Sequence, residues 1–175
     1  MKVGITYHEK FGQYDLGADH PFKGDRFANV MRLFEEQGLL RLPNVILLKP
    51  ELVTKRDLLR VHDEDYMDLI FRLAEVSEPY DIETPVSPQI LEAAQLLIGG
   101  AIDSGKAIYE GNVNRAVALG CGYHHAGRNY GGGFCLFNDI AVLVEYLREK
   151  YGLKRLLIVD YDVHFGNGTS DIYYS

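Results

Sequence analysis

The chain has 175 residues, of which 47% are hydrophobic and 25% are charged, a composition typical of one soluble globular domain. Its formal net charge of −7 disfavours tight binding to nucleic acid, because such an interface needs a basic face. No apolar run approaches the roughly 20 residues of a membrane span, and the N-terminus lacks the apolar core of a signal peptide. We therefore expect neither direct nucleic-acid binding nor a membrane-embedded part.

The charge and the cysteines also bear on substrate and location. An acidic surface is compatible with a basic substrate such as a lysine-rich peptide or a polyamine, although ordinary soluble proteins have such surfaces too. The two cysteines, Cys121 and Cys135, argue against a disulfide scaffold and indicate a reducing, cytoplasmic compartment. Each lies in a glycine-rich, aromatic segment, where a small buried side chain is a simpler interpretation than a catalytic thiol.

The first part of the chain predicts strands that alternate with helices. Lys2–Tyr7 is a short β-prone run, and Val45–Leu48 reads as a second strand that Pro50 closes. Between them, Asp25–Gln37 carries apolar residues at helical spacing, and Gly38 ends that helix. This order is typical of an α/β protein.

Two further helices follow. Asp63 is in place to cap a helix over Glu64–Val76. Ser87 followed by Pro88 is a strong helix start, and the pattern continues to Tyr109. The segment between these helices, residues 78–85, is expected to be a loop.

The last third adds two strands and one helix. Ala116–Leu119 predicts a buried strand, and a helix starts at Asn138 or Asp139 and ends near Tyr151. Leu156–Val159 is a continuous apolar run, which suits a parallel strand covered on both faces. The fold class predicted is therefore α/β, as a three-layer α/β/α sandwich with a mostly parallel sheet.

The most polar segment directly follows the last predicted strand. Asp160, Asp162 and His164 are spaced two apart, so in an extended segment their side chains point to one face. Carboxylate oxygen and imidazole nitrogen at this spacing suit a divalent metal such as zinc. The competing interpretation is a solvated strand end with a helix-capping aspartate.

Two glycine-rich segments precede it. His124 and His125 follow the strand at 116–119, so they should lie at the same sheet edge, as metal ligands, as acid and base, or merely in a polar loop. Gly131–Gly133 predicts irregular backbone, and the adjacent Phe134 and Phe137 suit the wall of an apolar slot or a flexible turn with two core side chains.

Two rival metal sites are less consistent with these residues. The pair Asp160 and Asp162 resembles the Asp-x-Asp of haloacid-dehalogenase-type phosphatases, but that motif opens its domain and continues with threonine rather than with His164. A binuclear arginase-like site would need a carboxylate two residues after this histidine, where the chain has Gly166.

Taken together, these segments resemble the histone deacetylase family, which includes acetoin-utilization proteins and acetylpolyamine amidohydrolases. The matching runs are residues 124–126, 132–138 and 160–169, and upstream residues 20–26 and 61–66 match as well. The resemblance covers nearly the whole chain. It implies an arginase/deacetylase-like fold in which residues 1–175 are the N-terminal part of a single deacetylase domain, whose C-terminal part is absent from this chain.

The resemblance also implies roles for individual residues. Asp162 and His164 match two of the three ligands of Zn²⁺, for which Fe²⁺ is an alternative. His124 and His125 match the catalytic pair, with His125 as general base and then acid. Asp160 matches the carboxylate that orients His124, and its backbone matches a structural K⁺ site.

Other matches concern the neighbours of these groups. Asn167 matches the partner of His125, and Arg26 matches an arginine near an internal cavity that helps acetate leave. Gly133 matches a backbone acceptor for the substrate amide, Phe134 a wall of the acyl-lysine tunnel, and Asp63 belongs to the matched rim loop and is assigned to substrate binding.

The function implied is zinc-dependent hydrolysis of acetylated amines, either acetylated lysine peptides or acetylpolyamines. The third zinc ligand and the tyrosine that holds the oxyanion belong to the family's C-terminal half. We therefore expect this chain alone to be inactive and to need that half as a partner. The alternative is a non-catalytic module for acyl-lysine recognition or for assembly.

Overall fold

A computed structural model describes residues 1–174 of the protein. Its sheet has three parallel strands in the order β2-β1-β3. These strands are β1 (Val3–Thr6), β2 (Val45–Leu48) and β3 (Arg115–Ala118). All three lie within one residue of where the sequence predicted them, but β3 is not the buried strand predicted, because it pairs on one side only and Val117 is 46% exposed. Because the strands are parallel, their carboxyl ends meet at one edge of the sheet.

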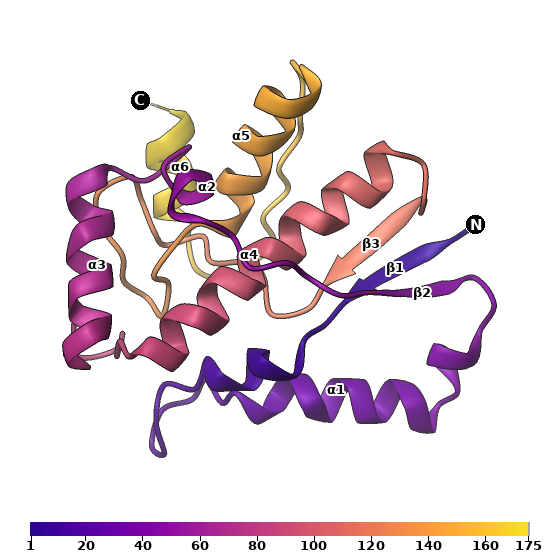
Figure 1. Ribbon diagram of the computed structural model, residues 1–175, viewed down its shortest axis with the longest axis horizontal. Coiled ribbons are helices and arrows are strands. Elements are labelled where there is room, and N and C mark those ends of the chain that lie inside the picture. Colours follow the sequence, from indigo (N-terminus) through magenta and orange to yellow (C-terminus); the bar gives the residue numbers. More distant parts are fainter. Residues whose placement is uncertain (175) are drawn as a thin grey trace.

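The helices surround this sheet (Figure 1). They are α1 (Asp25–Glu36), α2 (Lys55–Leu58), α3 (Glu64–Val76), α4 (Pro88–Tyr109), α5 (Asp139–Tyr151) and α6 (Asn167–Tyr173), with the 3₁₀ turns η1 (Glu9–Gln13) and η2 (Leu39–Arg41). Helix α4 packs on the strands, α5 packs on α4, and α1 runs below the sheet in the view of Figure 1. The α/β sandwich is confirmed.

Local capping explains the bounds of the longer helices. The Ser87 hydroxyl accepts a hydrogen bond from the backbone N–H of Ile90 at 3.2 Å, and Pro88 takes the first helical position of α4. Helix α5 ends at Gly152, whose φ of 67° is left-handed. The predicted cap at Asp63 is wrong in one respect, because its side chain makes no capping hydrogen bond in α3.

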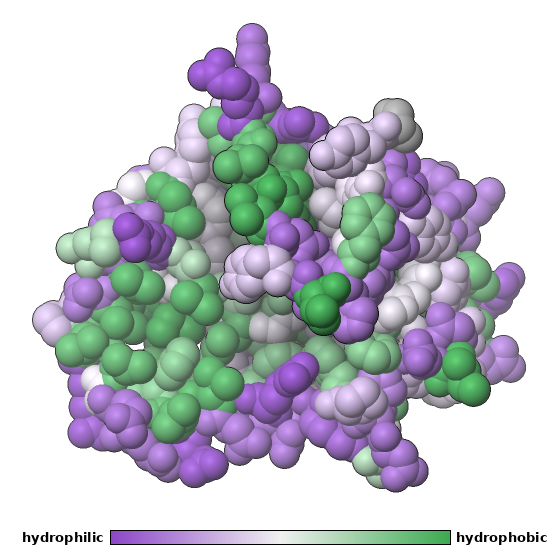
Figure 2. All heavy atoms as spheres, turned by 180° about the vertical axis from the view of Figure 1, so that it is seen from behind, coloured by the Kyte–Doolittle hydropathy of each residue, from purple (hydrophilic) through white to green (hydrophobic). Residues whose placement is uncertain are grey.

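The core lies between α4 and the segments around it. Its fully buried side chains include Phe11, Tyr14, Leu97, Phe137 and Val142. The opposite face of the sheet is less covered: Ile5 is buried, but Leu47 and Val117, its neighbours in the same row, are exposed. Figure 2 shows extended hydrophobic areas on the side turned away in Figure 1.

The predicted buried strand at Leu156–Val159 is wrong. Residues 152–160 belong to no strand or helix, and Leu157 and Val159 are 87% and 70% exposed. The run predicted burial on both faces, but burial needs neighbouring strands and covering helices. Within residues 1–174, β3 pairs with β1 on one side and with no strand on the other, so this segment finds no partner.

The described residues contain no helix that is both long enough and apolar enough to cross a bilayer.

Candidate active site

A cavity of about 540 Å³ lies beyond the carboxyl end of β3. Three segments that are distant in sequence line it, with contributions from the loop before α1. Its lining includes most of the predicted site residues: Arg26, His124, His125, Gly133, Phe134, Asp162 and His164. A larger cavity of about 700 Å³ lies along residues 156–174 and shares Asp162 and His164, but neither His124 nor His125 lines it. We therefore place the site in the smaller cavity.

The two histidines lie against one another. Their ring centroids are 4.1 Å apart, and His124 is buried. The Nδ1 atom of His124 is 2.7 Å from a carboxylate oxygen of Asp160, and the Nδ1 atom of His125 is 2.6 Å from the side-chain oxygen of Asn167. The structure therefore brings together the two predicted histidine–partner pairs.

These partners fix the protonation of the rings. An ionised carboxylate only accepts hydrogen bonds, so Nδ1 of His124 carries the proton. The amide nitrogen of Asn167 faces the hydroxyl of Tyr130 at 3.3 Å, which leaves its oxygen to accept from Nδ1 of His125. With Nδ1 protonated, a neutral His125 has a bare Nε2, the form that a general base requires.

The same hydrogen bonds act on the carboxylate. The pKa of Asp160 is lowered, chiefly by the hydrogen bond from His124 and then by the backbone N–H of Asp162. Asp160 is therefore ionised near neutral pH. A carboxylate stabilises an imidazolium more than the neutral amide of Asn167 does, so the two histidines have electrostatically different partners.

Asp162 and His164 lie on the same side of the segment, as their spacing predicted. A carboxylate oxygen of Asp162 is 3.1 Å from Nδ1 of His164 and also accepts from its backbone N–H at 2.8 Å. These hydrogen bonds lower the pKa of Asp162. The side chains are 51% and 73% exposed, and the His164 ring is 6.1 Å from that of His125.

This pair fits part of a zinc site. Carboxylate and imidazole are zinc ligands, and at bond lengths of about 2.0–2.1 Å two tetrahedral ligands are separated by roughly the distance seen between these atoms. Across residues 1–174, no group of three or more His, Cys, Asp or Glu side chains could hold a metal ion. A catalytic zinc typically has three protein ligands, so the pair would supply two of them.

The loop after the histidines approaches them closely. A Cβ atom on Gly133, whose φ is +52°, would lie 2.5 Å from Cδ2 of His125, so only glycine fits. Phe134 also has a positive φ, of 73°, and its carbonyl accepts a hydrogen bond from the buried Tyr14 hydroxyl at 2.6 Å. The ring of His20 packs edge-on against Phe134 at 4.4 Å. Phe134 is thus a fixed wall of the cavity.

A buried polar network supports the floor of the site. The Asn138 backbone N–H donates to Nε2 of His62 at 3.1 Å, and Nδ1 of His62 donates to the carbonyl of Gly127 at 2.9 Å. Burial lowers the pKa of His62 to about 4, so this ring is neutral near pH 7. The sequence indicates Asn138 as a helix start and as the end of a matched run, and His62 as part of another matched run, but it assigns neither a role in the site.

The structure does not bring Asp63 to the cavity. Its backbone N–H donates to the carbonyl of Arg128 at 2.8 Å, its side chain is exposed, and it is not part of the lining. Besides Asp162, the acidic residue that lines the cavity is Glu83, from the loop between α3 and α4. No local pattern marks Glu83, because the loop position depends on tertiary packing.

Comparison with known proteins finds relatives over most of the chain. Residues 20–175 match the family described as histone deacetylase domain. The chain is 31% identical to a probable deacetylase of Archaeoglobus fulgidus over 100% of this chain and 49% of the relative. It is 32% identical to the acetoin utilization protein AcuC of Bacillus subtilis over 97% of this chain and 46% of that protein.

A solved structure described as a histone deacetylase homologue from Aquifex aeolicus superposes with a TM-score of 0.88 at 29% identity, over 99% of this chain and 48% of that one. The chain thus spans about half the length of the relatives it matches. With a family match across residues 20–175 and a shared fold, this chain belongs to the histone deacetylase family.

Proposed function

We propose that this chain supplies the acid–base residues and two metal ligands of a metal-dependent deacetylase site, and that the C-terminal half of the domain completes it. The reaction is hydrolysis of the acetyl amide of an acetylated lysine peptide or an acetylpolyamine. One observation carries the proposal: His124 and His125 share one cavity with Asp162 and His164, and each histidine has a different hydrogen-bonding partner.

The residues divide the chemistry between them. The metal, Zn²⁺ or Fe²⁺, would be held by Asp162 and His164 together with a ligand from outside this chain. Once bound, it would polarise the acetyl carbonyl and lower the pKa of a coordinated water. Nε2 of His125 accepts a proton from the attacking water, since its Nδ1 is already protonated. His124, paired with the charged Asp160, stabilises negative charge that develops on the carbonyl oxygen.

The remaining lining suits an acylated amine. Phe22 and Phe134 are aromatic lining residues on which the aliphatic stem of a lysine or polyamine would pack. Glu83 and the net charge of −7 favour a cationic substrate over an acidic one. A K⁺ ion held partly by the Asp160 backbone is part of the same proposal, and the cytoplasm is the proposed location.

The decisive experiment completes the domain. A chimaera that joins residues 1–175 to the C-terminal half of the Archaeoglobus fulgidus relative, called here the completed enzyme, is assayed with a fluorogenic acetyl-lysine peptide and with an acetylpolyamine. We expect turnover that chelation abolishes and zinc restores, and none from the 175-residue chain alone. Deacetylation by the chain alone would refute the need for a second half.

Calorimetric titration separates the alternatives. The 175-residue chain should bind zinc at least about 100-fold more weakly than the completed enzyme, because a ligand is missing. A non-catalytic module would instead bind an acetyl-lysine peptide without turning it over, even when complete and loaded with zinc. Magnesium-dependent phosphatase activity that Asp160→Asn abolishes would replace the deacetylase proposal altogether.

A further inference from the structure

Asp139 is a buried carboxylate that the proposed chemistry does not use. It is the first residue of α5, is 2% exposed, and does not line the site cavity. Burial raises its pKa, and hydrogen bonds from the backbone N–H groups of Tyr123 and Gly122 lower it in part. A buried carboxylate without hydrogen-bonding partners would cost free energy on folding, so the partners of Asp139 indicate its role.

Its backbone partners are the two residues directly before the histidine pair, and the Cys121 side chain is a further hydrogen-bonding partner. One oxygen of Asp139 accepts from the backbone N–H of Tyr123 at 2.7 Å, and both oxygens lie 3.1 Å from that of Gly122. Residues 121–123 belong to no helix or strand. The carboxylate therefore supplies the hydrogen-bond acceptors that a neighbouring strand or helical turn would otherwise provide for these two backbone N–H groups.

Asn138 acts on the other side of the pair. Its side-chain nitrogen donates to the carbonyl of Ala126, the residue directly after His125, and to the hydroxyl of Thr169, both at 3.0 Å. Its side-chain oxygen accepts from the backbone N–H of Ala141 and so caps α5. Asn138 is fully buried.

Asn138 and Asp139, which are adjacent at the start of α5, thus bind the backbone on both sides of the histidine pair. Asp139 fixes the backbone before His124, Asn138 fixes the backbone after His125, and α5 fixes both. Rotation of either ring is limited by Asp160 and Asn167, and the backbone N–H of Thr169 donates to the carbonyl of His124 at 3.1 Å. Asp139 and Asn138 add hydrogen bonds to the backbone on the two sides of the pair. Positioning within a fraction of an ångström is what catalysis requires.

We infer that Asn138 and Asp139 are positioning residues, which hold the histidine pair in place from its two flanks without touching the substrate. The structural part of this inference concerns the chain itself. The catalytic part rests on the proposed deacetylase function. The two parts are therefore tested separately.

The structural test is amide hydrogen exchange in the 175-residue chain. Asp139→Ala should accelerate exchange at Gly122 and Tyr123 at least tenfold, beyond any change in global unfolding measured on the buried amides of α4. Ser87→Ala is the control, because it removes a side chain that accepts a backbone hydrogen bond at the start of another helix and lies outside the site. Unchanged exchange at Gly122 and Tyr123 in a folded variant would overturn the inference.

A milder pair of variants covers the case in which Asp139→Ala does not fold. Asp139→Asn keeps the shape but leaves one oxygen to accept two N–H groups, and Asn138→Asp keeps the cap but removes the donor to Ala126. We expect the first to accelerate exchange at Gly122 and Tyr123, and the second at residues around Ala126. Protection unchanged in both would also overturn the inference.

The catalytic test uses the completed enzyme. Asp139→Asn should lower kcat about tenfold or more with KM changed less than twofold, because chemistry and not substrate binding depends on the histidines, whereas Ser87→Ala should leave kcat unchanged. Full kcat in Asp139→Asn would overturn the positioning role while leaving the deacetylase function intact. If the completed enzyme deacetylates nothing, the proposed function fails, and the exchange experiment still decides whether the flanks are held.

Discussion

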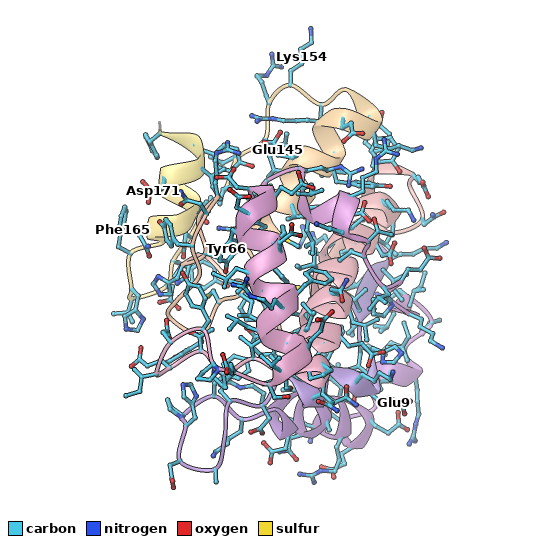
Figure 3. All side chains as sticks on the ribbon, turned by 60° about the vertical axis from the view of Figure 1, so that its left-hand side comes forward. Glu9, Tyr66, Glu145, Lys154, Phe165 and Asp171 are labelled. Atoms are coloured by element: carbon cyan, nitrogen blue, oxygen red, sulfur yellow. The ribbon has the colours of Figure 1, made fainter. Side chains whose placement is uncertain are left out.

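The two walls of the site cavity are built differently. The wall formed by residues 123–126, called here the histidine wall, is largely buried, and His124 is 6% exposed. Asn138 and Asp139 form hydrogen bonds with the backbone on its two sides. The metal wall, residues 160–166, is open, and most of its side chains face solvent. Figure 3 shows Phe165 directed outward from the segment that leads into α6.

The difference follows from what each wall packs against. The histidine wall is hydrogen-bonded to the start of α5 and adjoins the buried core. The metal wall follows residues 152–160, which pair with no strand among the residues that the structure describes. Apart from the hydrogen bond between Asp160 and His124, it is held by short-range hydrogen bonds, such as those from the backbone N–H groups of Asp162 and His164.

The comparison teaches which part of the site this chain can organise alone. The acid–base pair is already held in one geometry, with its tautomers set by Asp160 and Asn167. Asp162 and His164 lie within hydrogen-bonding distance of one another and are more than half exposed, and within residues 1–174 no third His, Cys, Asp or Glu side chain joins them as a metal ligand. Since the chain spans about half of its relatives, we expect the remaining half of the domain to pack on the metal wall.

The largest expected effect separates the two walls by function. In the completed enzyme, His125→Ala should lower kcat by about 10²–10⁴-fold, as expected for loss of a general base, and change zinc affinity less than about threefold. His164→Ala should remove measurable zinc binding and activity together. Steady-state kinetics and calorimetric zinc titration of both variants check this, and loss of zinc in His125→Ala would contradict the division.

The second effect concerns acid stability of the buried wall. His62 is neutral in the folded protein, with its pKa lowered by burial to about 4 from 6.5. Between these values the unfolded chain binds more protons, so the stabilising contribution is complete above pH 6.5 and is lost as the pH falls towards 4. The difference corresponds to about 3 kcal/mol in the free energy of unfolding.

Urea unfolding at a series of pH values measures this contribution. His62→Gln should be less stable at pH 7 and should lose much of the slope between pH 6.5 and 4. The control is His164→Gln in chelating buffer, which removes a largely exposed imidazole from the metal wall. An equal flattening of the slope in both variants would show that burial of His62 is not its cause.

The contrast between the walls also explains what could be predicted from the sequence. The bounds of α4 and α5 were predictable because Ser87, Pro88, Asn138 and Gly152 act locally. The pairing of His124 with Asp160 followed from the family resemblance and could not be derived from spacing alone. The strand at Leu156–Val159 was wrongly predicted because an apolar run indicates that a segment can be buried in a sheet. It does not show whether a neighbouring strand is present to pair with it.

The positioning residues were missed for a different reason. Asn138 has one local partner, Ala141, and the sequence pattern indicates only this contact, because it is a helix cap. Its contact with Ala126, like that of Asp139 with Gly122, joins segments 12 and 17 residues apart through an irregular loop. Short-range periodicity does not register such contacts, and only the tertiary structure places them beside the site.

The smallest expected effect tests whether the metal wall is unfinished or simply exposed. Leu157→Ser in the 175-residue chain should change the free energy of unfolding by less than about 0.5 kcal/mol, since the side chain is 87% exposed. Leu97→Ala, in the fully buried part of α4, should cost about 2–5 kcal/mol under the same conditions. In the completed enzyme, packing against the second half should bury Leu157, and Leu157→Ser should then cost about 2 kcal/mol. Urea unfolding of both proteins measures the change, and an effect that stays below about 0.5 kcal/mol in the completed enzyme would mean that residues 156–159 face solvent in the whole domain as well.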